Sequence, residues 1–147
     1  MSFPGFILGS ASFAESTAFD EFFNDTQQST TSNGWVTYDT FTTPEAKEPG
    51  IYRLDWAVEM GQSKKQKRVG LLIEAREGTS GAFTEFYDER VALGDDNIFT
   101  GVTFFKVFEI VSEDVFQIRV RFGQTSDGGT GRIRNVNIVL FKVGEAP

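Results

Sequence analysis

The chain repeats a two-residue alternation of apolar and polar side chains. Within Gly50–Met60, large apolar residues occupy one side of the alternation, and mostly charged residues occupy the other. The apolar set is Tyr52, Leu54, Trp56, Val58 and Met60, against Arg53, Asp55 and Glu59, with Ile51 and Ala57 as exceptions. The same alternation returns in Val115–Phe122. Successive residues of a β-strand point to opposite faces of a sheet, so each segment is predicted to be a strand with one face in a core.

Segments of this kind continue along the chain and are separated by glycine, proline and polar turns. The predicted strands after residue 34 are Trp35–Phe41, Ile51–Met60, Val69–Arg76, Ala82–Leu93, Ile98–Val111, Val115–Phe122 and Arg132–Val143. About eight strands with short connections predict an all-β fold, an antiparallel β-sandwich of jelly-roll type. Ala82–Leu93 carries many charges, which favours a position at the edge of a sheet.

Residues 1–34 differ in composition and are predicted to form an N-terminal arm and a polar linker, ahead of a sandwich domain at residues 35–147. The stretch Thr26–Gly34 is polar and low in complexity, which is typical of a loop or linker. Ala14–Asp25 could instead form a short helix, and a first strand after a frayed terminus is the other alternative. The arm's apolar residues need cover, so they are candidates for contact with a neighbouring molecule: Phe3, Phe6, Ile7, Leu8 and Phe13.

Three of the predicted strands carry apolar residues on both faces. Leu72 opposes its apolar neighbours in Val69–Ile73, and Ile98–Val111 is apolar on both sides. In the last strand, Ile133, Val139, Phe141 and Val143 oppose Val136, Ile138 and Leu140. A domain of this size has one core, so the second apolar faces are predicted to meet in an oligomer or to lie under the N-terminal segment. The candidate interface residues are Phe99, Phe105, Val107, Val136, Ile138 and Leu140.

The amino-acid composition excludes several kinds of catalytic and cross-linking chemistry. The chain has no cysteine and no histidine, which excludes disulfides, thiolate nucleophiles and the serine–histidine–carboxylate triad. Pairs of strand carboxylates such as Glu74, Glu85 and Glu109 are the remaining route to an enzyme, and 21 acidic residues always offer such pairs. We therefore predict a non-enzymatic protein with no catalytic, cofactor or metal residue.

Net charge and hydropathy limit the classes of partner that the protein is expected to bind. The net charge of −7 disfavours nucleic acid, because phosphate repels an acidic chain at long range. No apolar run approaches the roughly 20 residues that cross a bilayer, so no membrane partner is expected. One basic cluster, Lys64, Lys65, Lys67 and Arg68, lies between two predicted strands. It is either a contact with an acidic capsid surface, a phosphate or a glycan, or a solvated loop.

Two smaller groups of polar residues have competing interpretations. Asp95–Asn97 has oxygen ligands that suit calcium, but three adjacent side chains do not converge on one ion, so a turn is favoured. Arg119 and Arg121 share the polar face of one strand. Together with Arg132 and Arg134 they could make an anion site, whereas pairing with carboxylates on neighbouring strands is the simpler expectation.

The order of strands and turns carries a family resemblance. Pro49-Gly50-Ile51-Tyr52 precedes an alternating apolar strand, and the glycine-rich turn Gly123–Gly131 precedes a terminal strand that is apolar on both sides. Over about residues 35–143, this pattern resembles the trimeric tumour-necrosis-factor/C1q-like jelly rolls. It looks most like their small phage-encoded members, which include capsid decoration (cement) proteins. The chain has neither the collagen-like stalk of the C1q proteins nor the membrane anchor of the cytokines, which argues against the animal relatives.

The resemblance implies a function. It implies a homotrimeric structural protein of the virion that is made in the host cytoplasm, docks on the major capsid protein or another virion protein, and stabilises the assembled shell. The alternative is a carbohydrate- or receptor-binding module of a tail fibre or spike. Its sugar platform would be formed by the aromatic residues Trp35, Tyr38 and Tyr87.

Overall fold

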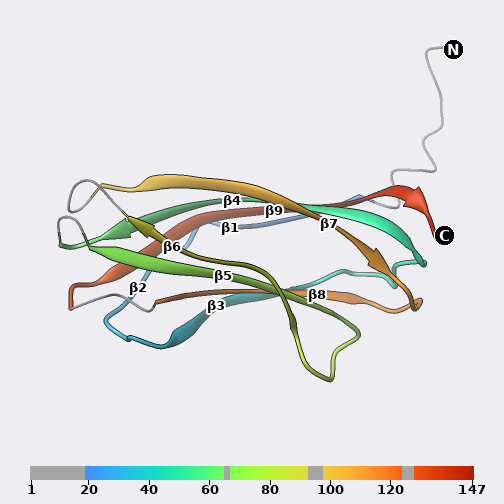
Figure 1. Cartoon of the computed structure of the whole chain (residues 1–147), viewed down its shortest axis with the longest axis horizontal. Coiled ribbons are helices and arrows are strands. Elements are labelled where there is room, and N and C mark those ends of the chain that lie inside the picture. Colours follow the sequence, from blue (N-terminus) through green and yellow to red (C-terminus); the bar gives the residue numbers. More distant parts are fainter. Residues whose placement is uncertain (1–18, 65–66, 93–97, 124–127) are drawn as a thin grey trace, which may run out of the picture.

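The computed structural model describes residues 19–64, 67–92, 98–123 and 128–147. Within these residues, nine strands form two antiparallel sheets that pack face to face (Figure 1). Across the described residues there is no helix that is long and apolar enough to cross a membrane. The two packed antiparallel sheets confirm the predicted antiparallel β-sandwich of jelly-roll type, with nine described strands instead of about eight.

Each sheet mixes strands that are distant in the sequence. Sheet A has the order β1 (Asp20–Asn24), β9 (Gly131–Glu145), β4 (Gly50–Gln62) and β7 (Thr100–Ile110), and β2 (Gln28–Thr30) also pairs with β9. Sheet B has the order β3 (Trp35–Thr42), β8 (Phe116–Gly123), β5 (Arg68–Glu77) and β6 (Thr84–Ala92). The charged strand β6 lies at an edge, as its composition predicts.

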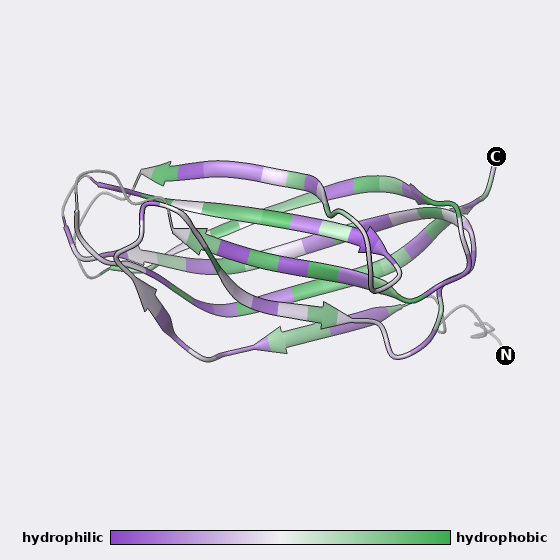
Figure 2. Ribbon diagram, turned by 90° about the horizontal axis from the view of Figure 1, so that it is seen from below, coloured by the Kyte–Doolittle hydropathy of each residue, from purple (hydrophilic) through white to green (hydrophobic). Residues whose placement is uncertain are grey.

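The core fills the space between the two sheets. In β4 the predicted apolar set is buried, and Tyr52, Leu54 and Met60 are completely inaccessible to solvent. The apolar set of β8 lies opposite, in sheet B, and is buried equally well. Figure 2 shows the cause, since apolar and polar residues alternate along most strands. Each strand contributes one side chain in two to the shared interior.

The N-terminal part of the described chain belongs to sheet A. β1 and β2 both pair with β9, and Asp20 forms an ion pair of 2.6 Å with the buried Lys47. The helix considered for Ala14–Asp25 is wrong for β1, because its burial alternates with a period of two and Phe22 packs on Phe41. Pairing with β9 outweighs local propensity here. The arm candidates Phe3, Phe6, Ile7, Leu8 and Phe13 lie outside the described residues.

A β-bulge changes which side chains of β9 face the core. The pairing of β4 with β9 shifts register between Ala57 and Glu59, and Asn135 has φ 51°, in the left-handed region. Ile133 and Val136 are both fully buried although their separation is odd. Placing Ile133 on the face opposite Val136 was therefore wrong, because one extra residue at a bulge reverses the alternation.

The left-handed conformation of Asn135 at the bulge leads to a prediction about stability. Asparagine tolerates the left-handed conformation, whereas a β-branched residue is strained there. Asn135→Val is expected to lower the free energy of unfolding by about 1–2 kcal/mol. Asn135→Gly is the matched control and should cost much less. Urea unfolding of the two variants measures the difference, and equal stabilities would contradict this account of the bulge.

Tyr38 ties β3 to the first two strands. Its ring is buried in the core, and its hydroxyl lies 3.0 Å from the carbonyl oxygen of Asn24 and 2.5 Å from that of Thr26. The hydroxyl has one proton to donate, so it bonds one carbonyl at a time. Burial, with smaller effects from Asp39 and Asp25, raises the pKa of Tyr38 to about 12.

This shift predicts a loss of stability at alkaline pH. The folded-state pKa of Tyr38 lies above 10.0, the ordinary pKa of a tyrosine hydroxyl, so its contribution to stability is complete below pH 10 and disappears as the pH rises through about 12. Tyr38→Phe should flatten that part of the unfolding profile and remove the last phenolate to appear in an absorbance titration. If Tyr38 ionised before Tyr52 and Tyr87, the assignment of its environment would be wrong.

Candidate functional site

The two outer faces of the sandwich differ in character. Across the described residues, every exposed large apolar side chain lies on a strand of sheet A or directly beside one. These residues are Phe19, Phe23, Ile98, Phe104, Phe105, Val107, Val111 and Val143. Phe23 is 58% exposed and Phe104 is 56% exposed, which is costly for large aromatic residues in water. Clustered exposed apolar area of this kind marks an interaction surface.

The outer face of sheet A is made of rows of cross-strand neighbours. From β7 across β4 to β9, the rows are Val107–Arg53–Phe141, Phe105–Asp55–Val139 and Thr103–Ala57–Asn137. Phe23 of β1 continues the last row beyond Asn137. Cross-strand neighbours share a face of the sheet, so these side chains form one continuous surface over four strands.

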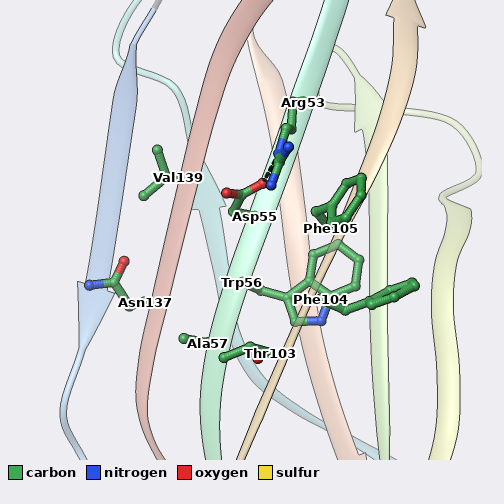
Figure 3. Close-up of a pocket in the computed structure, with 9 residues that line it drawn as sticks. All are labelled: Arg53, Asp55, Trp56, Ala57, Thr103, Phe104, Phe105, Asn137 and Val139. Carbon is green, nitrogen blue, oxygen red and sulfur yellow. Dashed lines mark hydrogen bonds and ion pairs between the residues drawn. The ribbon is translucent and has the colours of Figure 1, made fainter.

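An open depression of about 520 Å³ lies in this surface (Figure 3). The small residues Ala57 and Thr103 contribute to its lining, with Phe105 and Val139 also around it. Arg53 Nε donates a hydrogen bond of 2.6 Å to Asp55 Oδ1, and the guanidinium lies 4.0 Å from the centre of the Phe105 ring. The two charges therefore neutralise each other within the face.

A second arginine–aromatic unit lies farther along the same sheet. Arg134 Nε is 2.7 Å from Glu59 Oε1, and its guanidinium is 3.7 Å from the centre of the Phe99 ring. The hydrogen bond from Arg134 lowers the pKa of the Glu59 carboxyl. Arg53 and Arg134 are each paired with a carboxylate, which keeps the charge around them low and leaves apolar area as the main attraction for a partner.

An aromatic edge adjoins this face where the edge strands β6 and β7 face each other. The ring centres of Tyr87 and Phe104 are 5.8 Å apart, and both contact the buried Trp56. Phe104 also contacts Phe105 at 5.7 Å, so the edge and the outer face are continuous. The Trp56 Nε1 group is buried and donates no hydrogen bond to the protein. The edge thus extends the apolar surface of sheet A toward β6, and its residues Phe104 and Trp56 also line the depression.

The structure divides the predicted interface residues. Phe105 and Val107 lie exposed on the outer face of sheet A, and their role in an interface stays a prediction. Phe99 packs on Arg134 at the same sheet. Val136, Ile138 and Leu140 are fully buried in the core, so placing these three in an interface was wrong. They belong to the inward-facing set of β9, and the outward set includes Val139 and Phe141.

Sequence reasoning missed other parts of this surface. Phe23 falls within the predicted N-terminal arm and linker, and Phe104 was not among the candidate interface residues. Phe104 points to the face of β7 opposite Phe105, but its position on an edge strand leaves it uncovered. Ala57 and Ile51 interrupted the charged side of β4, and this interruption was the available signal that the outer face is partly apolar.

The remaining candidates do not assemble into a site. Lys64 is exposed and Lys67 is half-buried in the turn between β4 and β5, and Lys65 lies outside the described residues, as do Asp95–Asn97. Tyr38 is in the core, Tyr87 lies at the aromatic edge, and Trp35 lies on sheet B, so the proposed sugar platform is divided among three places. The described residues contain no group of three or more carboxylates arranged to hold a metal ion.

The four arginines also separate into two groups. Arg119 and Arg121 lie on sheet B, whereas Arg132 and Arg134 lie on sheet A. They therefore do not form one anion site. The prediction that they pair with carboxylates on neighbouring strands is confirmed for Arg119, which bonds Glu74, and for Arg134, which bonds Glu59.

The burial of β9 and β7 predicts a contrast between two substitutions. Leu140→Ala removes a core side chain and should lower the free energy of unfolding by about 2–5 kcal/mol. Val107→Thr changes an exposed position and should alter the stability of a single subunit by within about 0.5 kcal/mol. Urea unfolding at high dilution tests the pair. A large cost for Val107→Thr in an isolated subunit would show that the outer face is covered from within.

The fold is shared with proteins of virus particles. No protein-family model matches the chain, and no curated protein sequence matches it. A chain in the structure of the Gt strain of infectious bursal disease virus superposes with a TM-score of 0.55 at 14% identity, over 84% of this chain and 33% of that one. A mutant VP2 protein of the same virus, in derived T=1 particles, gives 0.51 at 15% identity, over 88% of this chain and 33% of that one.

A third structure superposes less well. The Eiger TNF of S. frugiperda gives a TM-score of 0.43 at 12% identity, over 67% of this chain and 62% of that one. This chain spans about a third of the length of the two viral chains. At these identities the likeness shows the fold alone, and that fold is the jelly-roll sandwich found in chains of these viral particles.

Proposed function

We propose that this protein is a non-enzymatic structural subunit of a virus particle, which assembles as a homotrimer through the outer face of sheet A. The observation that carries the proposal is the confinement of the exposed large apolar side chains to that sheet and its flanks. Such a surface is typical of a protein that is completed by association. The likeness in fold to chains of virus particles favours a viral setting.

The chemistry of the face supports a structural role over a catalytic one. The depression is shallow and open, and its charged lining residues, Arg53 and Asp55, bond each other. A catalytic cleft would be expected to hold an acid or base with a strongly perturbed pKa, and the chain has neither histidine nor cysteine to supply the usual ones. The apolar rows around the depression are suited to packing.

The arrangement of the two apolar surfaces favours a closed ring. The aromatic edge and the outer face of sheet A meet at Phe104, which also lines the depression. The Tyr87 side of the edge lies outside that lining, so this side of one copy can pack on the face of the next. A contact between unlike surfaces is heterologous, and its repetition closes into a ring when the rotation allows it. We propose that the β6 side of the aromatic edge, at Tyr87, packs on the depression beside Phe105 of the next copy, and that three copies complete the ring.

Within the particle, the trimer acts as a decoration (cement) protein, of the kind that bacteriophages encode, and docks on the assembled shell. Its stabilising mechanism is linkage: opening the shell would also require breaking the contacts that each trimer makes with neighbouring shell subunits. The predicted shell-facing contacts are the N-terminal residues Phe3, Phe6, Ile7, Leu8 and Phe13, with Lys64, Lys65 and Lys67. In purified particles, the copy number of the chain should be a multiple of three.

The mass of the protein in solution tests the proposal. Light scattering should give about three times 16.4 kDa over a range of concentrations. Phe105→Lys places a charge beside the depression and should reduce the mass to that of one subunit, because an unpaired charge in an apolar interface costs several kcal/mol.

A matched variant controls for the added charge. Thr37→Lys adds the same charge to an exposed position on the outer face of sheet B and should leave the mass of the trimer unchanged. A wild-type protein that stays monomeric at all concentrations would overturn the proposal. So would a Phe105→Lys trimer with wild-type stability, since the outer face of sheet A would then lie outside the interface.

A further inference from the structure

The outer face of sheet B is rich in charged side chains, most of them arginines, around the apolar Leu72. Register and alternation place eight charged side chains on it: Arg68, Glu74, Arg76, Glu85, Asp88, Arg90, Arg119 and Arg121. Five arginines and three carboxylates give this face a net charge of +2, whereas the whole chain has −7. A positive face on an acidic protein concentrates the attraction for anions in one place.

One part of this face is a rigid aromatic support. The guanidinium groups of Arg76 and Arg119 lie 4.2 Å and 4.0 Å from the centre of the Phe83 ring. Arg76 is fixed by hydrogen bonds to Gln117 Oε1 and to the carbonyl oxygens of Thr79 and Gly81, at 2.9, 2.9 and 2.6 Å. Arg76 therefore anchors the turn that carries Phe83, and Phe83 in turn orients Arg119.

The next part is an excess of guanidinium donors over acceptors. Arg119 Nε donates to Glu74 Oε1 at 2.7 Å, and Arg121 Nη1 is 3.9 Å from the same oxygen. Arg121 Nη2 donates to the carbonyl oxygen of Trp35 at 3.3 Å, and its Nε bonds no protein atom. Each guanidinium has five N–H groups, so a single carboxylate leaves most of this donor capacity unused.

We propose that Arg119 and Arg121, supported by Phe83, form a binding site for the side-chain carboxylates of an acidic polypeptide segment. Arginine presents a planar fork that matches a carboxylate in two parallel hydrogen bonds, and both arginines are already held in place. Ordering them in advance removes part of the entropic cost of binding. Glu74 is the internal competitor for the same donors.

The pattern of charge favours a polypeptide over a nucleic acid. Asp88 and Glu85 are cross-strand neighbours of Leu72 and Glu74, so carboxylates interrupt the positive face at its β6 side. A continuous phosphate backbone would be repelled by these carboxylates and by the net charge of the chain, whereas separate carboxylates can select individual arginines. The inference rests on the proposed function in one respect: sister subunits cover sheet A and leave this face outward, toward a partner.

Titration of a hexaglutamate peptide into the full-length protein tests the site. Binding should weaken as the salt concentration rises, because the contact is between exposed charges. Arg119→Gln should weaken it about tenfold, as expected for the loss of one charge-assisted hydrogen bond. Glu74→Gln should bind the peptide more tightly than wild type, since it removes the competing carboxylate, and a damaged fold cannot produce that gain.

Matched measurements make the outcome decisive. Lys142→Gln removes the same charge from β9 of sheet A, where Lys142 pairs with Glu48 and Glu145, and should bind the peptide like wild type. Equal losses for Lys142→Gln and Arg119→Gln would reduce the site to general charge attraction, and no gain for Glu74→Gln would also overturn the assignment. Tighter binding of an oligothymidylate of equal charge would identify a nucleic-acid surface. The mass of each sample separates the two proposals: absent peptide binding by an intact trimer refutes only the carboxylate site, and peptide binding by a monomer refutes only the trimer.

Discussion

A sandwich of two sheets has one interior, and this constraint organises the rest of the molecule. The sheets bury one face each, so any large apolar side chain on an outer face is left for another molecule to cover. The outer face of sheet B is mainly charged, as expected for a face in contact with water. The outer face of sheet A is partly apolar, because β7, β9 and β1 place phenylalanine and valine residues on or beside it.

The charges follow from the same division. On sheet A, Arg53 and Arg134 are each paired with a carboxylate and stacked on a phenylalanine, which leaves little net charge to disturb an apolar contact. On sheet B, Arg119 and Arg121 share a single carboxylate, so positive charge remains. The sandwich thus offers an apolar face suited to copies of itself and a basic face suited to an acidic partner.

The strands with strict apolar–polar alternation could be predicted from the sequence. The predictions failed where a bulge or a long-range strand pairing determines the structure. β4 and β8 bury the residues their alternation predicts, because each has one apolar face and no bulge within the predicted set. β9 differs at Ile133, where the bulge at Asn135 reverses the alternation, and no short-range signal announced that bulge. β1 pairs with the last strand of the chain, and a contact so distant in sequence lies beyond local propensity.

The candidate surface was predictable only in part for related reasons. Two apolar faces in β9 were visible in the sequence, but which of them faces outward depends on register with β4. Phe105 and Val107, which were predicted to lie in an interface, are exposed, whereas Val139 and Phe141 were left out of that prediction in favour of their buried neighbours. The exposure of Phe104 follows from the edge position of β7, which strand order alone decides.

Hydroxyl-radical footprinting measures the central claim most directly, because it reports which outer face of the sandwich is covered in solution. The account predicts that Phe23, Phe105 and Val107 are protected at concentrations where the protein is assembled and become reactive on dilution. Phe83 and Trp35, on sheet B, should react equally at both concentrations. Strong labelling of Phe105 in the assembled protein, or protection that is confined to sheet B, would contradict the assignment of sheet A as the face where subunits meet.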